Sequence, residues 1–145
     1  MNKVIQVISS RVSCRSYSDK KVPKGKLSQI LEAGKFAPSG MNKQVCNILV
    51  IKSKSLLEKI RLALKEKFNR DCLYGAPHLC LVKGNENEPL LVQDASCILE
   101  NMFVAATALK VDSCCTRLSA GRLSWGLWTR RRWFRRRHCP LCRRG

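Results

Sequence analysis

Residues 11–44 read RVSCRSYSDKKVPKGKLSQILEAGKFAPSGMNKQ, and this stretch decides how the rest of the chain is interpreted. Its middle carries residues at the spacing of one helix face, namely Leu27, Ile30, Leu31 and Gly34. Pro23 can open such a helix, since a proline in the first turn gives up no hydrogen bond, and the helix must end before Pro38. The stretch is therefore predicted to be a polar loop, a helix and a second polar loop.

The first loop, residues 11–15, places two guanidinium groups and a hydroxyl group at alternating positions. Because side chains alternate sides in an extended segment, Arg11, Ser13 and Arg15 would project in one direction. Arginine forks beside a hydroxyl group suit a phosphate, which accepts paired, charge-assisted hydrogen bonds. A basic loop that only contacts water has the same composition, so the loop alone leaves both interpretations open.

The second loop, APSGMNKQ at residues 37–44, supplies a hydroxyl group and two amides at Ser39, Asn42 and Gln44. An amide presents a donor and an acceptor together, as the edge of a planar heterocycle requires. The same residue types also make ordinary turns. This loop is a second candidate for ligand contact, with a purely structural turn as the alternative.

Beyond this stretch the pattern predicts further helices. They are expected at residues 2–10, from Ser55 onward, and at residues 90–109. The first is amphipathic, with Val4, Ile5 and Ile8 on one side. Ser55 and Glu58 have the spacing of a capping box. The last helix is apolar nearly all round, which is typical of a core or a subunit interface.

Short strands separate these helices. A buried strand is expected in VCNILVIKS at residues 45–53, and another in HLCLV at residues 78–82. DSCCTRL, residues 112–118, is a candidate third strand. Helices clustered before and between isolated strands indicate an α+β domain.

Several enzyme classes lack support in this sequence. No glycine-rich dinucleotide fingerprint follows a predicted strand, and no P-loop is present. His78 and His138 are the two histidines, which are too few for a His-based hydrolase or a metal centre. His78 is interpreted as a histidine of a turn or of the core.

No segment that would direct the chain out of the cytoplasm is recognised. The N-terminal apolar stretch is too short for a signal peptide, and no apolar run approaches the ~18 residues of a membrane span. Cys46, Cys80 and Cys97 lie singly in apolar stretches, as buried reduced thiols do. We therefore expect a cytoplasmic protein without membrane contact.

Charge divides the chain into two compositions. The total net charge of +18 suggests at first a nucleic-acid binder. Residues 1–115 hold fourteen Lys, four Arg and ten acidic residues, which leaves +8, whereas residues 116–145 hold ten Arg and no acidic residue. All three Trp lie in this second part, which ends in WTRRRWFRRRHCPLCRRG. More than half of the net charge thus belongs to a short C-terminal segment.

The order and spacing of the two loops resemble the nitroreductase family of FMN-dependent oxidoreductases. That family has a short helix, then a loop with Arg-Arg-Ser-x-Arg-x-Phe/Tyr, then a helix that ends in Ala-Pro-Ser-x-x-Asn-x-Gln. In this chain Val12 replaces one of the arginines of that loop, and Arg11, Ser13 and Arg15 remain. The resemblance covers residues 2–116 and continues through NILVIKSKSLLEKI, YGAPHLCLV and DASCILENMFVAATALKVDSCC. Each motif is short, and the specificity comes from the joint pattern.

The resemblance implies an α+β fold with a central mixed sheet flanked by helices, in an enzyme that works as a homodimer with the long apolar helix at its interface. FMN would be the cofactor and NADH or NADPH the co-substrate. The electron acceptor would be a nitroaromatic compound, a quinone or a similar small molecule. Because the cofactor carries the chemistry, no catalytic side chain is implied, which agrees with the missing catalytic signatures.

The resemblance also assigns residues to the cofactor. The FMN phosphate and ribityl chain would be held by Arg11, Ser13 and Arg15. The flavin would be contacted, in part from the partner chain, by Pro38, Ser39, Asn42 and Gln44. Asn69, in KFNRD before the second strand, would meet the pyrimidine edge of the flavin.

The family pattern stops at about residue 116, which predicts two parts. Residues 1–118 would form an incomplete FMN-binding domain without the C-terminal part of the fold, and residues 119–145 an Arg/Trp-rich, disordered tail. The abrupt change of composition favours a shifted reading frame, with no specific nucleic-acid partner. Two alternatives stand beside it. The tail could be a nucleic-acid arm of a non-enzymatic binding protein, or a zinc site built on His138, Cys139 and Cys142.

Overall fold

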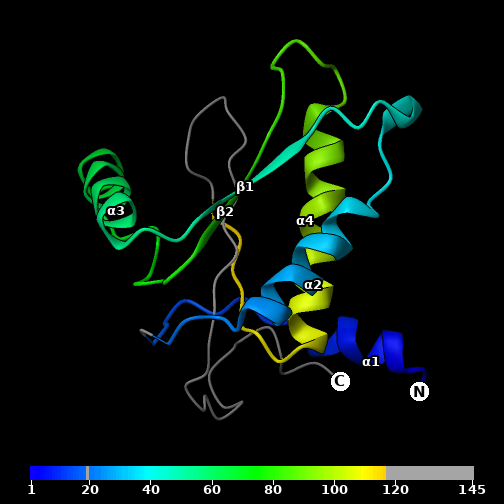
Figure 1. Ribbon diagram of the computed structural model, residues 1–145, viewed down its shortest axis with the longest axis horizontal. Helices are drawn as coiled ribbons and strands as arrows, with labels where there is room; N and C mark the ends of the chain where they lie inside the picture. Colours follow the sequence, from blue (N-terminus) through cyan, green and yellow to red (C-terminus); the bar gives the residue numbers. More distant parts are fainter. Residues whose placement is uncertain (19, 117–145) are drawn as a thin grey trace.

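The computed structural model describes residues 1–18 and 20–116, in which helices surround a small sheet (Figure 1). The elements are α1 (Lys3–Ser10), α2 (Lys24–Lys35), the 3-10 helix η1 (Gly40–Asn42), β1 (Asn47–Ile51), α3 (Lys54–Phe68), β2 (Leu79–Lys83) and α4 (Leu91–Ala108). Helices combined with a separate sheet confirm the expected α+β class.

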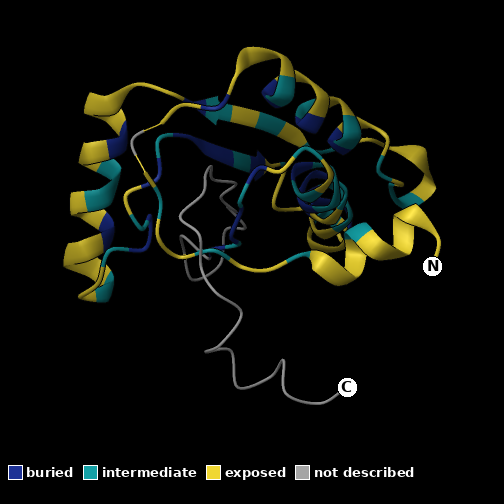
Figure 2. Cartoon of the chain, turned by 90° about the horizontal axis from the view of Figure 1, so that it is seen from below, coloured by how far each residue is buried: buried dark blue, intermediate teal, exposed yellow. Residues whose placement is uncertain are grey.

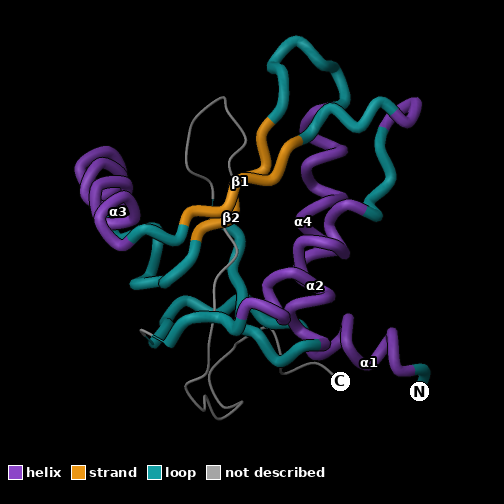
Figure 3. Tube along the Cα trace, in the orientation of Figure 1, coloured by secondary structure: helices purple, strands orange, loops and turns teal. Residues whose placement is uncertain are grey.

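The sheet is an antiparallel pair of β1 and β2, in which Leu49 lies opposite Leu81. α3 connects the two strands and lies on the side of the molecule away from α2 and α4 (Figure 3). In the part of the chain that the structure describes, the predicted third strand at residues 112–118 is reduced to a single parallel bridge between Ser13 and Ser113. The parallel pairing that an expected mixed sheet requires is therefore confined, among the described residues, to that bridge.

α2 packs against α4 along the face that its apolar spacing predicted (Figure 1). The buried residues of α2 are Leu27, Ile30 and Gly34. A side chain at Gly34 would meet Met102 Cγ of α4 at 2.9 Å, so the glycine lets the two helices approach closely. Asn101 of α4 donates from Nδ2 to the Ala33 carbonyl at 3.2 Å and ties the helices together.

The buried side chains form two hydrophobic clusters. The first joins α2, α4 and the sheet, with Ile30, Met102 and Val82 all 0% exposed. The second lies between α3 and the segment before β2, and contains Leu64 and Leu73. α3 thus buries one stripe and leaves its outer face in water, as an amphipathic helix does (Figure 2).

Two local expectations were wrong. The N-cap of α3 is Ser53, which accepts a hydrogen bond from the first turn, and not Ser55. Glu58 is consequently free of the capping role and pairs with Arg61 at 2.8 Å. β1 was expected to be a buried strand, but its residues alternate between the core and the surface, and Leu49 is 46% exposed. Within one chain, only one face of β1 is covered.

α1 has the predicted range, but its apolar side is uncovered. Val4, Ile5 and Ile8 are 61%, 54% and 52% exposed, and the helix has no buried residue. Exposed apolar side chains that gather on one face are typical of a surface that meets another chain.

No helix among residues 1–18 and 20–116 is both long enough and apolar enough to cross a membrane. The Arg/Trp-rich tail predicted for residues 119–145, with its shifted-frame, nucleic-acid and zinc interpretations, lies outside the described residues. The last two residues of the predicted domain, 117 and 118, lie outside them as well.

Candidate functional site

The first candidate loop, residues 11–15, follows α1 and runs beside the segment at Ser113. The Cys14 N–H donates to the Ser113 carbonyl at 3.0 Å, and Ser13 forms the parallel bridge with the same residue. Arg11 Nη1 donates to Ser13 Oγ at 3.5 Å. The side chains of Arg11 and Ser13 therefore project in one direction, as their alternation predicted.

The guanidinium groups of this loop have no acidic partner in the part of the chain that is described. No ion pair there engages Arg11 or Arg15. Both arginines act on Cys114: burial raises the pKa of this thiol, and the charges of Arg15 and Arg11 oppose that rise. Both cations therefore lie within electrostatic range of Cys114, which places positive charge at this end of the loop.

Tyr17 anchors the loop from its other end. Its hydroxyl group donates to the Cys14 carbonyl. Burial raises the pKa of the Tyr17 phenol far above its ordinary value, so the group stays protonated and remains a donor.

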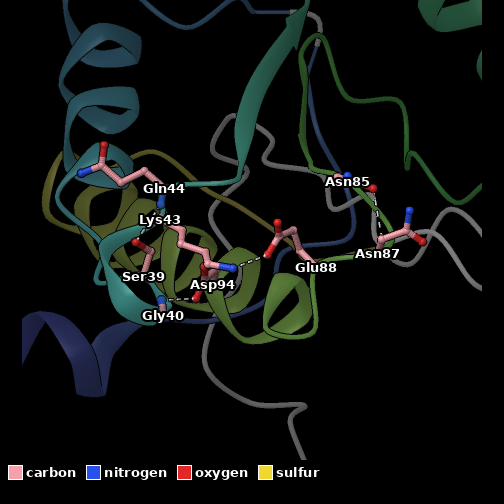
Figure 4. Close-up of polar contacts among 8 residues, drawn as sticks. All are labelled: Ser39, Gly40, Lys43, Gln44, Asn85, Asn87, Glu88 and Asp94. Atoms are coloured by element: carbon pink, nitrogen blue, oxygen red, sulfur yellow. Dashed lines mark hydrogen bonds and ion pairs between the residues drawn. The ribbon is translucent and has the colours of Figure 1, made fainter.

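The second candidate loop folds tightly around η1 (Figure 4). Ser39 Oγ accepts a hydrogen bond from the Gln44 N–H at 3.0 Å. Gln44 Nε2 donates to Asn42 Oδ1 at 3.3 Å. Met41, Asn42 and Gln44 have left-handed backbone, with φ of 50°, 55° and 49°. Such conformations cost about 1–3 kcal/mol each outside glycine and persist where the surroundings hold them.

Two acidic residues near the start of α4 provide that hold (Figure 4). Asp94, which is 5% exposed, accepts a hydrogen bond from the Gly40 N–H at 2.9 Å. Glu88 pairs with Lys43 at 3.3 Å. Asp94 was not among the predicted site residues, although a carboxylate on a largely apolar helix indicates that a donor must meet it. The sequence does not show that the donor lies 54 positions away.

The structure places the two loops at opposite ends of α2 (Figure 1). The 12 residues of α2 lie between them, and a helix of that length is about 18 Å long. Pro38 is exposed at the start of the second loop. Within one chain, the arginine loop and the amide loop are therefore not brought together.

Asn69 lies apart from the second loop. It is the C-cap of α3, exposed and in the left-handed conformation with φ of 52°. α3 and η1 lie on opposite sides of the molecule in both views (Figures 1 and 2). Asparagine tolerates left-handed backbone better than most residues, so the helix end by itself accounts for its presence here.

The comparisons with known proteins agree with this fold. The model of the nitroreductase family matches residues 8–71. A nitroreductase with bound FMN from Bacteroides fragilis NCTC 9343 is 32% identical, with a TM-score of 0.77 over 81% of this chain and 71% of that chain. An FMN-dependent nitroreductase from Clostridium difficile R20291 is 26% identical, with a TM-score of 0.76 over 81% of this chain and 62% of that chain.

Curated relatives extend the comparison. A protein of Archaeoglobus fulgidus named for NADH dehydrogenase and NAD(P)H nitroreductase is 29% identical over 115 residues, which are 78% of this chain and 66% of that protein. The chain spans less than two thirds of the length of this relative. It spans 56% and 24% of the lengths of two further curated relatives. The family match and the fold shared at 32% identity show that this chain belongs to the nitroreductase family.

Proposed function

We propose that this chain acts as an FMN-dependent oxidoreductase that passes electrons from NADH or NADPH to a small acceptor, such as a nitroaromatic compound or a quinone. Family membership and the FMN-bound relative at 32% identity support the proposal. The observation that carries it is the pair of polar loops at the two ends of α2, one cationic and one rich in amides. Together they offer anion contacts and hydrogen bonds for a ring edge.

The first loop fits the phosphate of FMN. Arg11 and Arg15 form no ion pair with a described carboxylate, and Ser13 Oγ lies within 3.5 Å of an Arg11 nitrogen. A phosphate dianion would accept paired, charge-assisted hydrogen bonds from the guanidinium groups.

The second loop fits the polar edge of a flavin. Asn42 and Gln44 are exposed, and the hydrogen bond between them uses one oxygen and one nitrogen. An amide oxygen and an amide nitrogen stay available, so the loop can both accept and donate. Ser39 keeps the backbone of this loop closed by accepting from the Gln44 N–H.

A second copy of the chain completes the site in this proposal. The two loops of one chain are separated by α2, whereas a two-fold dimer can bring the first loop of each protomer to the second loop of its partner. The exposed apolar side of α1, formed by Val4, Ile5 and Ile8, supports such an interface, since another chain can remove it from water. Each dimer would hold two equal sites.

A bound FMN would supply the two-electron chemistry between nicotinamide and acceptor. The chain's own residues would bind and orient this cofactor. Arg11 and Arg15 hold the phosphate, Asn42 and Gln44 align the ring, and Asp94 keeps the amide loop in place through the Gly40 N–H. The proposal assigns no catalytic side chain.

We also place the protein in the cytoplasm. All seven cysteines of the described residues are free thiols, as suits a reducing compartment. No described residue gives separate support to the nucleic-acid alternative, which rests on the tail.

The test is FMN titration of the full chain by flavin fluorescence, with NADH and NADPH oxidation measured in the presence of a quinone. Arg11→Ala and Arg15→Ala should each weaken FMN binding by about 1.5–3 kcal/mol, because each removes hydrogen bonds to a charged group. Lys20→Ala, an exposed lysine of the same segment outside the loop, is the control and should leave the affinity unchanged. A chain that binds no FMN and oxidises neither nucleotide would refute the proposal.

A further inference from the structure

A cavity of about 200 Å³ lies where the start of α3 faces the segment before β2. Its apolar floor includes Leu57, Leu73 and Ala76, which are buried in the second hydrophobic cluster. Its charged rim is formed by Lys21, Lys52, Lys54, Glu58 and Arg61. None of the residues assigned to FMN lines this cavity, so it is a separate feature of the fold.

The rim carries an excess of positive charge. Its carboxylate, Glu58, is paired with Arg61 at 2.8 Å, and Arg61 also lies 3.9 Å from Asp71, so the charge of Arg61 is already balanced. No ion pair among the described residues engages Lys21, Lys52 or Lys54. Ammonium groups gathered around one cavity repel one another, and an anion in the cavity would relieve that repulsion.

The start of α3 adds to this excess. The first turn of the helix has no acidic residue, although negative side chains are favoured at the positive end of a helix dipole. Lys54, the first residue of α3, carries a positive charge, which is unfavourable at this end of the helix dipole. Ser53 Oγ accepts from the Leu56 N–H at 3.4 Å, whereas the N–H groups of Lys54 and Ser55 come before the first intrahelical hydrogen bond and can donate to an anion.

The charges of the cavity lysines reach a buried side chain, the imidazole ring of His78. The ring is 4% exposed, and its Nδ1 atom has no hydrogen-bond partner in the described part of the chain. Burial lowers the pKa of His78, and the charges of Lys52 and Lys21 lower it further. An anion held by these lysines would offset their field and raise the pKa of His78.

We propose that this cavity binds a phosphate group, either inorganic phosphate or the phosphate of a small phosphorylated molecule. A compact dianion can meet three ammonium groups and the N–H donors at the start of α3 together. The apolar floor favours the second source, because it would remove an attached organic group from water.

Calorimetric titration of the full chain at constant ionic strength, with inorganic phosphate and with phenyl phosphate, tests this inference. The double variant Lys52→Ala/Lys54→Ala removes two rim charges. Lys59→Ala/Lys65→Ala removes the same charge from exposed positions of α3 that do not line the cavity. The rim variant should lose roughly tenfold or more in affinity for both probes, whereas the control should change by about twofold at most.

The outcomes separate the sources. Tighter binding of phenyl phosphate than of inorganic phosphate identifies the ester as the ligand class, and equal affinity identifies free phosphate. If the two double variants lose phosphate affinity equally, the binding is general attraction by a chain of net charge +18, and the proposal is overturned. Absence of saturable binding by the unmodified chain would overturn it as well.

A second measurement needs no change to the cavity. The chain has two histidines, so His138→Gln leaves His78 alone in the nuclear magnetic resonance spectrum. Saturating phosphate should raise the pKa of His78, and an unchanged pKa would contradict a phosphate beside Lys52 and Lys21. FMN affinity should be unchanged in Lys52→Ala/Lys54→Ala, so a failure of this inference is distinguishable from a failure of the proposed function.

Discussion

Replacement of Asp94 tests the contact that holds the second candidate loop. This carboxylate is 5% exposed and accepts from the Gly40 N–H at 2.9 Å, which joins α4 to a loop 54 positions earlier. Asp94→Ala removes the acceptor and leaves that N–H unpaired. We expect the loop to lose its attachment while α2 and α4 stay packed through Gly34 and Met102.

The magnitude follows from the charge and burial of the acceptor. Hydrogen bonds to charged groups contribute about 1.5–3 kcal/mol, so Asp94→Ala should lower the free energy of unfolding by about that amount. Asp94→Asn keeps an acceptor oxygen but loses the charge. Because charge-assisted hydrogen bonds are roughly twice as strong as neutral ones, the amide should recover about half of the loss.

Urea unfolding followed by circular dichroism measures this loss, and FMN titration measures its effect on the site. Glu88→Ala is the matched control, because it removes a second contact of the same loop. The Lys43–Glu88 pair is 3.3 Å long with side chains 46% and 28% exposed, so its loss should cost less than about 1 kcal/mol. If Asp94→Ala unfolds at the same urea concentration as the unmodified chain, the buried carboxylate does not hold the loop.

Three further predictions concern packing, ionisation and assembly. Gly34→Ala places a methyl group 2.9 Å from Met102 Cγ and should lower the free energy of unfolding in urea by about 1–3 kcal/mol. Gly25→Ala is the control, because no atom lies within 4 Å of the added methyl group, and it should be neutral or stabilising. Equal effects of the two variants would contradict the close approach of α2 and α4. Burial raises the pKa of Cys80 from 9.0 to about 12, so the unfolded chain loses this proton first, and stability should fall as pH rises from 9 toward 12. The fall should be shallower in Cys80→Ala, and an unchanged slope would assign it to other groups. Ile5→Asp should convert the proposed dimer to a monomer in light scattering, whereas a retained dimer would place the interface elsewhere.

The elements with local signals could be predicted from the sequence. α2 begins after Pro23 and ends before Pro38, and α4 (Leu91–Ala108) lies within the expected residues 90–109. Prolines and periodic apolar residues act over a few positions, so a short window contains the whole signal. The shift of the α3 cap from Ser55 to Ser53 marks the limit, because several hydroxyl groups close together can each cap a helix.

The candidate site was predictable in its residue types but not in its arrangement. The sequence identified an arginine loop and an amide loop, and the structure adds that α2 holds them apart within one chain. The exposed side of α1 and the half-exposed β1 could not be foreseen either, because an apolar pattern does not say which surface will cover it.

The sequence by itself determined the α+β class and the places of its local elements. Only the tertiary structure decided which distant groups meet: Asp94 with the Gly40 N–H, Ser13 with Ser113, and the lysines around the cavity at α3. A helix or a turn is selected by neighbours in the chain, whereas these contacts must repay the entropy of closing long loops through the packing of the whole domain.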